Sequence, residues 1–138
     1  MEKVEALKSV CVDTDVIIDY LRGREPGKSA FENWRKKVRV CITSITGFEL
    51  LLGASLSSKR EKRTLEVESL LHQHEILAFT LDAARKAAEK GAQLKEKGTP
   101  IEIRDLLNAS ICLNNKIPIL TRNKAHYEKI EDLTVLTP

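Results

Sequence analysis

The stretch Val10-Cys11-Val12-Asp13-Thr14-Asp15-Val16-Ile17-Ile18-Asp19-Tyr20-Leu21 indicates the fold class of the chain. Its first three residues are small and apolar, which predicts a short buried strand that ends at Asp13. Over residues 16–21, apolar side chains then recur at the i, i+1, i+4, i+5 spacing of one buried helical face. In an open α/β sheet, the carboxyl end of a strand opens into the crevice where ligands bind. Asp13 therefore either caps the following helix or serves as a catalytic carboxylate at that edge.

The rest of the chain continues this alternation of strands and helices. Further strands are expected at 38–42, 75–79, 117–120 and 133–136, and further helices at 28–37, 45–53, 57–73, 81–97 and 105–113. Such an alternation predicts a parallel sheet that is covered by helices on both faces. The expected fold is therefore a three-layer α/β/α arrangement around a central parallel sheet of four to five short strands. At 138 residues, positions 1–138 are expected to form a single domain.

Composition restricts the function classes. Hydrophobic residues make up 42% and charged residues 31% of the chain, which is typical of a globular protein. The net charge of +3 permits a nucleic-acid partner but does not require one. No apolar run approaches the roughly 18 residues of a membrane span, and the N-terminus lacks the pattern of a secretory signal. The three cysteines lie in apolar runs without a C-x-x-C pair, which predicts buried thiols in a reducing cytoplasm.

Two further carboxylates occupy unusual positions. Glu49 lies in the apolar segment 45–53, which we expect to be a helix capped by Ser44, ended by Gly53 and buried nearly all round. An ionised carboxylate there is unfavourable unless a cation or several donors meet it. Asp105 begins another apolar helix, where the positive end of the helix dipole favours a carboxylate. Each acid also has a purely structural explanation, since Glu49 can reach water at a helix edge and Asp105 can cap its helix.

Together the three acids favour a metal-dependent phosphodiesterase. Carboxylates that converge at one sheet edge repel each other unless a cation neutralises them. A hard divalent ion such as Mg²⁺ accepts oxygen ligands and keeps water molecules, one of which can attack a phosphate. Thr121 and Asn123 form a polar tip after the strand 117–120, in the same strand-to-loop position as Asp13. This tip is expected to lie beside the acids.

The sequence resembles the PIN-domain ribonucleases, specifically the VapC-type toxins of prokaryotic toxin–antitoxin pairs, over nearly its whole length. The segments that carry the resemblance are VDTDVII (12–18), SITGFELLLG (44–53), RDLLNAS (104–110) and ILTRN (119–123), with Tyr127 following. Their order and spacing are specific, although no single segment is. The resemblance implies a PIN-like fold and Mg²⁺- or Mn²⁺-dependent endonucleolytic cleavage of RNA. It also implies a homodimer and a VapB-type antitoxin whose C-terminal segment blocks the active groove.

The resemblance also implies roles for particular residues. By position in the motifs, the acidic metal ligands are Asp13, Glu49 and Asp105. Thr121 matches a hydroxyl residue near the catalytic site, and Asn123 stands where family members often have a fourth acid. Many members also carry an acid at the position of His126. An amide can hold a metal-bound water but adds no charge, so binding of a second metal ion stays open. Asp15 stands where the family often has Asn, and it either restores negative charge or caps the helix.

Three cations flank the expected acids and are candidates for holding the RNA backbone: Arg104, Arg122 and Lys124. Cations beside a carboxylate cluster attract the phosphodiester that the acids alone would repel. Ordinary surface charge is the alternative explanation for each of them. Aromatic residues are only 4% of the chain, so base stacking is expected to be minor. Phe31 and Trp34 are expected to form part of a hydrophobic groove or a dimer contact.

Two other functions stay open from the sequence. A haloacid-dehalogenase-like phosphatase would use the pattern Asp13-Thr14-Asp15 with Asp13 as its nucleophile. That enzyme needs a later pair of acids, for which Glu131-Asp132 is a poor candidate, and it leaves Glu49 unexplained. A non-catalytic PIN-like module would bind RNA or a protein without cutting. The amide at Asn123, where a fourth acid is often found, keeps this second alternative open.

Overall fold

A central parallel sheet organises the molecule. The computed structural model describes residues 7–138, and within them the sheet has five strands. These are β1 (Ser9–Val12), β2 (Arg39–Thr43), β3 (Glu75–Leu77), β4 (Ile119–Leu120) and β5 (Val135–Leu136). They lie in the order β3-β2-β1-β4-β5, and every neighbouring pair is parallel. The predicted parallel sheet is therefore confirmed, with β1 at its centre.

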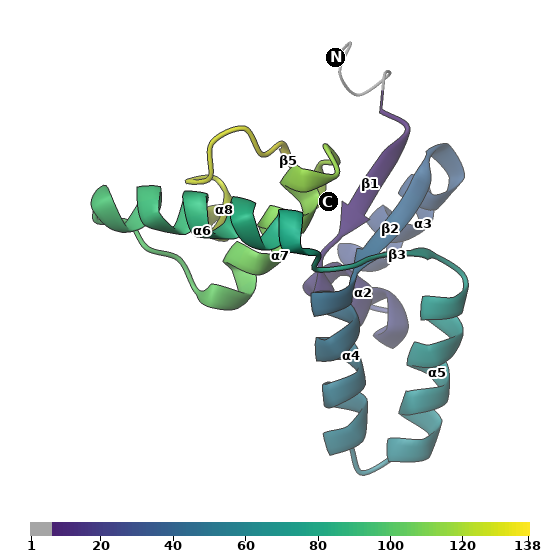
Figure 1. Cartoon of the computed structure of the whole chain (residues 1–138). Helices are drawn as coiled ribbons and strands as arrows, with labels where there is room; N and C mark the ends of the chain where they lie inside the picture. The colour runs from purple at the N-terminus through teal and green to yellow at the C-terminus, as the bar shows by residue number, and fades with distance from the viewer. Residues whose placement is uncertain (1–6) are drawn as a thin grey trace.

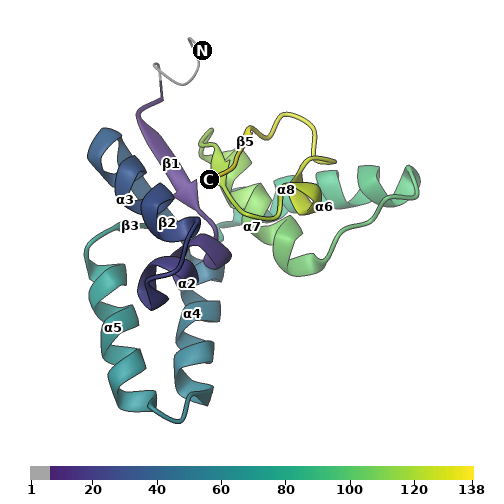
Figure 2. The same cartoon turned by 180° about the vertical axis from the view of Figure 1, so that it is seen from behind.

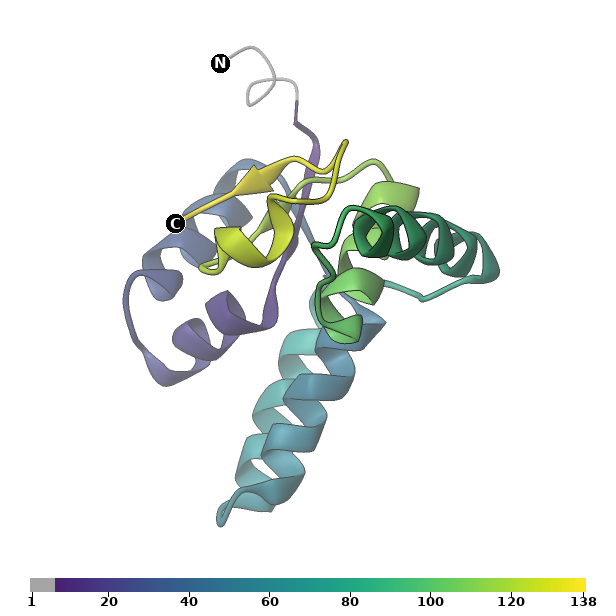
Figure 3. The ribbon, with the colours of Figure 1, turned by 90° about the vertical axis from the view of Figure 1, so that its left-hand side faces the viewer.

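Helices cover both faces of the sheet. They are α2 (Thr14–Arg22), α3 (Gly27–Lys37), α4 (Ser44–Leu56), α5 (Arg60–His72), α6 (Leu81–Glu96), α7 (Ile103–Asn114) and α8 (Lys124–Tyr127). Figures 1 and 2 show α2 and α3 on one side of the sheet and α6, α7 and α8 on the other. The pair α4 and α5 extends away from the sheet as a helical hairpin (Figure 3). Along residues 7–138, no helix has the length and apolar character needed to cross a membrane.

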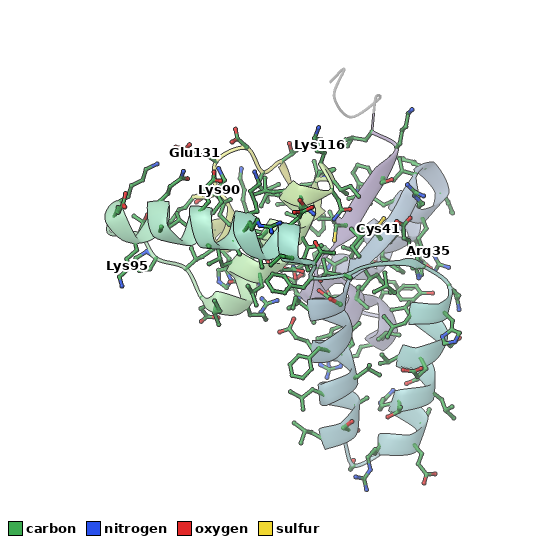
Figure 4. All side chains as sticks on the ribbon, in the orientation of Figure 1. Arg35, Cys41, Lys90, Lys95, Lys116 and Glu131 are labelled. Carbon is green, nitrogen blue, oxygen red and sulfur yellow. The ribbon has the colours of Figure 1, made fainter. Side chains whose placement is uncertain are left out.

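β1 is buried on both faces, which explains why its sequence reads as a continuous apolar run. Val10 and Val12 pack into the apolar cluster that contains Phe31. Cys11 points to the opposite face and packs into the cluster that contains Ala109. All three cysteines are buried with free thiols, as predicted, and Figure 4 labels one of them on β2. The alternation fixes the strand between two helical layers and places Asp13 at its carboxyl end.

α4 differs from its expected form in three respects. Thr43 rather than Ser44 caps it, because the Thr43 hydroxyl accepts the backbone N–H of Thr46 at 3.0 Å. The helix also continues through Gly53, since a single glycine inside a helix is unfavourable by only about 1 kcal/mol. Finally, the helix is not buried all round. Phe48 is 62% exposed, and one apolar face of α4 points to solvent while another packs against α5.

Phe31 lies in the core, so the expectation that it forms a groove or a dimer contact is wrong. Its side chain is fully buried. The ring centroid of Phe31 lies 4.6 Å from that of Tyr20 and 5.6 Å from that of His74, and these two rings cover it. Trp34 is only partly buried and packs at the margin of the same cluster.

Candidate active site

The carboxyl ends of adjacent strands bring polar side chains together. Asp13 follows β1, Thr43 ends β2 and Thr121 follows β4. Asp13 is 1% exposed and caps α2, because its Oδ1 accepts the backbone N–H of Thr14 at 2.8 Å. Its Oδ2 accepts the Thr121 hydroxyl at 2.8 Å. The capping role of Asp13 is therefore confirmed, and the same carboxylate lies at the sheet edge where ligands bind.

Glu49 reaches the same edge from α4. Its Oε1 accepts the Thr14 hydroxyl at 2.6 Å and lies 2.9 Å from Nη1 of Arg104. The Glu49 side chain is half-buried rather than enclosed by apolar groups. A hydroxyl and a guanidinium thus supply the donors that an ionised carboxylate requires when water is partly excluded.

Asp105 enters the site from the first turn of α7. Its side chain is buried, and its Oδ1 lies 2.5 Å from Nη2 of Arg104 and accepts the Tyr127 hydroxyl at 3.3 Å. Its Oδ2 lies 3.0 Å from Nδ1 of His126. The cap position of α7 belongs to Glu102, so capping does not account for Asp105. Its partners are side chains that meet it at the sheet edge.

Asn108 connects these groups, although the sequence suggested no role for it. The side chain is fully buried, and its Oδ1 accepts the Thr43 hydroxyl at 2.5 Å. Its Nδ2 donates to Oδ1 of Asp13 at 3.3 Å and to the Tyr127 hydroxyl oxygen at 3.2 Å. The available signal was an amide in an otherwise apolar helix. Of its partners, Asp13 follows β1, Thr43 ends β2 and Tyr127 belongs to α8. No local sequence pattern reveals that these residues meet.

Asn123 lies against Asp15 rather than among the three acids. Its Nδ2 donates to Oδ2 of Asp15 at 2.8 Å, and the backbone N–H of Arg122 donates to the same oxygen at 3.1 Å. Asp15 does not cap α2, because Asp13 does. Its Oδ1 is buried and has no hydrogen-bond partner within residues 7–138.

The three cations that were expected to hold RNA have different surroundings. Nη1 of Arg122 lies 3.1 Å from Oδ1 of the buried Asp19, which makes Asp19 an ion-pair partner. Lys124 is exposed at the start of α8. The guanidinium of Arg104 lies among the acids. Burial opposes the charge of that guanidinium and lowers its pKa, but Tyr127 and the carboxylates of Asp13, Asp105 and Glu49 outweigh burial, so the pKa of Arg104 is raised.

The sequence pattern of the PIN domain matches residues 10–132 of this chain. The chain belongs to the PIN-domain family. This PIN domain is 31% identical over 97 residues to the tRNA(fMet)-specific endonuclease VapC of Salmonella typhimurium, and the match covers 70% of this chain and 74% of that protein. It is 27% identical over 132 residues to ribonuclease VapC1 of Methanocaldococcus jannaschii, covering 96% of this chain and 87% of that protein.

The fold of this PIN domain also matches solved structures. The crystal structure of DNA-bound VapBC from Salmonella typhimurium superimposes with a TM-score of 0.84 at 26% identity, covering 95% of this chain and 98% of that chain. The expected resemblance to VapC-type PIN domains and the expected three-layer α/β/α fold are thus confirmed.

The donor set of this PIN domain fits a hard divalent cation. Asp13, Glu49 and Asp105 offer only oxygen atoms, which Mg²⁺ and Mn²⁺ prefer to sulfur. The unpartnered Oδ1 of Asp15 is a further buried oxygen near Asp13, where a positive charge is favoured. Among the side chains that the structure describes, no group of three or more His, Cys, Asp or Glu residues is arranged so that it could hold a metal ion as it stands. The guanidinium of Arg104 lies between the three acids.

Asp15 is expected to give the metal-free PIN domain a distinct pH dependence. Burial, and next the charge of Asp13, raise the pKa of Asp15 from 3.8 to about 6. Between these values the folded state binds more protons than the unfolded state, so stability falls as pH rises. We expect the unfolding temperature to decrease from about pH 4 to about pH 6 and the Asp15→Asn variant to lose this component. Thermal unfolding across this range measures the effect.

A matched control for that experiment is Asp82→Asn, because Asp82 is an exposed aspartate on α6. Its unfolding temperature should follow that of the wild type at every pH. An unchanged slope in the Asp15→Asn variant would assign the pH dependence to another group.

Proposed function

We propose that this VapC-type PIN domain is a metal-dependent endoribonuclease and the toxin of a toxin–antitoxin pair. The observation that carries the proposal is the convergence of Asp13, Glu49 and Asp105 on one cationic group at the carboxyl edge of the sheet. The acids come from three separate elements, so their approach is a property of the fold. The relatives named as VapC ribonucleases or endonucleases support RNA as the substrate.

In the proposed mechanism, Asp13, Glu49 and Asp105 hold Mg²⁺ or Mn²⁺. When bound, such an ion supplies a water of lowered pKa and a positive charge for a phosphate oxygen. Other side chains of the chain keep the acids in place. Thr121 and Asn108 donate to Asp13, and the Tyr127 hydroxyl donates to Asp105. These bonds fix the direction of each carboxylate, as supporting groups do in metal sites generally.

Substrate contacts in this proposal come from the exposed cations near the acids. Lys124 lies at the start of α8, three residues after Thr121, and Arg122 lies between them in the chain. A phosphodiester next to the acids would meet their positive charges, which hold the backbone without reading sequence. His126 contacts Asp105 and is itself exposed, so it lies at the border between the acids and solvent.

We also propose a VapB-type antitoxin as the partner of this chain, because the matched Salmonella typhimurium structure is a VapBC complex. A groove of about 130 Å³ between α2, α4 and α5 is lined by apolar side chains that include Ile18, Leu50 and Val67. Glu49 lines the same groove. An apolar segment of a partner in this groove would therefore lie next to the acids. A homodimer and a cytoplasmic site of action remain expectations, and free buried thiols are typical of that compartment.

The proposal is tested by incubating antitoxin-free protein with an end-labelled pool of mixed RNA. The reactions contain Mg²⁺, Mn²⁺ or a chelator. We expect internal cuts at defined positions with either metal and none with the chelator, because the acids require a cation to approach a phosphodiester. RNA that survives every metal condition while the protein binds metal would overturn the nuclease assignment. That result would favour the non-catalytic module instead.

The phosphatase alternative is wrong for this chain. The chain belongs to the PIN-domain family. The two later acids that the phosphatase would need also pair elsewhere: Glu131 lies 2.9 Å from Lys97 and Asp132 lies 3.5 Å from Lys90, measured from carboxylate oxygen to Nζ. Figure 4 shows Lys90 on α6 and Glu131 close to that helix. When the protein is incubated with Mg²⁺ and a phosphomonoester, we therefore expect no release of phosphate.

A further inference from the structure

Arg104 contacts all three of the proposed metal ligands. Its Nη1 lies 2.9 Å from Oε1 of Glu49 and 3.6 Å from Oδ1 of Asp13. Its Nη2 lies 2.5 Å from Oδ1 of Asp105. One planar guanidinium thus spans carboxylates that come from three elements of the fold. Its N–H donors form a broad, planar fork that can contact several carboxylates at once, whereas a lysine ammonium is a compact point charge.

This arrangement solves an electrostatic problem of the metal-free protein. The Asp13 and Asp105 side chains are each 2% exposed, so water screens their repulsion poorly. The guanidinium of Arg104 lies at ion-pair distance from both carboxylates, and its positive charge offsets their repulsion. The Arg104 side chain is itself 29% exposed, which makes it the solvent-accessible member of the cluster.

The guanidinium and a divalent ion exclude each other from this position. Mg²⁺ requires oxygen ligands at about 2.0–2.1 Å, so the carboxylates must close around one point. The guanidinium now lies between those oxygens, and its positive charge would repel a divalent ion at that distance. In keeping with this spacing, residues 7–138 contain no group of three or more His, Cys, Asp or Glu side chains that could hold a metal ion without rearrangement.

We propose that Arg104 is an internal counter-cation that competes with the divalent metal for Asp13, Glu49 and Asp105. The inference rests on the proposed metal-binding role of these acids. In the metal-free state Arg104 neutralises them and keeps the site assembled. Metal binding displaces the guanidinium toward solvent at the start of α7, where the neighbouring Ile103 is already exposed. Arg104 therefore sets the metal concentration at which the site becomes loaded.

The direct test is calorimetric titration of metal-free protein with Mn²⁺, without RNA. Arg104→Gln removes the competing charge but keeps a polar side chain of similar length. We expect the Kd for Mn²⁺ to fall roughly tenfold or more, because one unit charge at ion-pair distance in a partly solvated site has an effect of this size. Arg104→Lys should give an intermediate Kd, since an ammonium keeps the charge but not the reach.

The matched control is Arg39→Gln, which removes the same charge at a position away from the acids. Arg39 begins β2, at the opposite end of the strand from the acids, and contacts Glu75 and Ser9, so the Kd should stay within about twofold of the wild type. A similar drop in both variants would assign the effect to general charge rather than to the contacts of Arg104.

Thermal unfolding supplies a second readout that does not require catalysis. Without metal, Arg104→Gln leaves two buried carboxylates without their cation, so its unfolding temperature should lie below that of the wild type. Saturating Mn²⁺ should then raise the unfolding temperature more in the variant than in the wild type, because tighter binding stabilises the folded state further. If Arg104 had a purely structural role, the Arg104→Gln substitution would lower the unfolding temperature by the same amount with and without Mn²⁺.

The outcomes separate this inference from the proposed function. If the wild type binds Mn²⁺ and Arg104→Gln binds it equally or more weakly, the competition is refuted while the metal site stands. If neither protein binds Mn²⁺, the metal-binding role of the acids fails and the inference fails with it. Should Arg104→Gln not fold without metal, Arg104→Lys is compared with the wild type instead, and a Kd for Mn²⁺ that is not lower than that of the wild type would refute the competition.

Discussion

Asp13→Asn is expected to reduce the rate of RNA cleavage by roughly two to three orders of magnitude while the protein stays folded. Asp13 is buried at the centre of the proposed site and accepts from Thr14, Thr121 and Asn108. An amide has nearly the same size and can still accept the Thr14 N–H, so the cap of α2 survives. The negative charge is lost, and with it most of the affinity for a cation.

Single-turnover cleavage of a defined RNA, at a Mn²⁺ concentration that just saturates the wild type, measures this effect, and circular dichroism checks the fold. Asp82→Asn is a suitable control because it makes the same chemical change at an exposed position on α6. Its rate should equal that of the wild type. Unchanged cleavage by a folded Asp13→Asn protein would show that the reaction takes place elsewhere on the molecule.

Asn108→Ala is expected to lower the free energy of unfolding by about 3 kcal/mol. The side chain is fully buried, and its removal leaves a cavity. It also deprives the Thr43 hydroxyl of its acceptor and Asp13 and Tyr127 of a donor. Buried polar groups without partners are unfavourable by about 1–3 kcal/mol each, although neighbouring groups can partly satisfy one another.

Urea-induced unfolding of the metal-free protein measures this loss. The control is Asn114→Ala, which makes the same substitution at an exposed position of α7 and should change stability by less than about 0.5 kcal/mol. A loss below about 1 kcal/mol for Asn108→Ala would mean that water or a shifted side chain replaces the amide. The network would then contribute little to the rigidity of the site.

Much of the fold was predictable because the central strands are buried on both faces. Such strands carry continuous apolar runs, which β1 shows between residues 10 and 12. Polar residues that follow these runs mark the carboxyl edge of a parallel sheet, and Asp13 and Thr121 were found in this way. Local patterns therefore identified both the architecture and the edge where the acids meet.

The contacts within the site were not predictable from local patterns. Asn108 and Asp13 are 95 residues apart in the chain, and Asn123 and Asp15 are 108 residues apart. Their distances depend on how α7, α8 and the sheet pack, and periodicity reports burial but not partners. The exposure of Phe48 illustrates the same limit, because an apolar pattern predicts a buried face without telling which surface covers it.

The pairing of β1 with β4 has a consequence for the synthesis of the protein. Cys11 lies opposite Ile119 and Val12 opposite Leu120, so β1 pairs with a strand that is synthesised more than a hundred residues later. Contacts of such long sequence separation form slowly and late. A nascent chain carries Asp13 and Glu49 while Thr121, His126 and Tyr127 are still inside the ribosome. The candidate active site of the proposed nuclease is therefore complete only after the segment beyond β4 has emerged. Unfinished chains do not carry the assembled site.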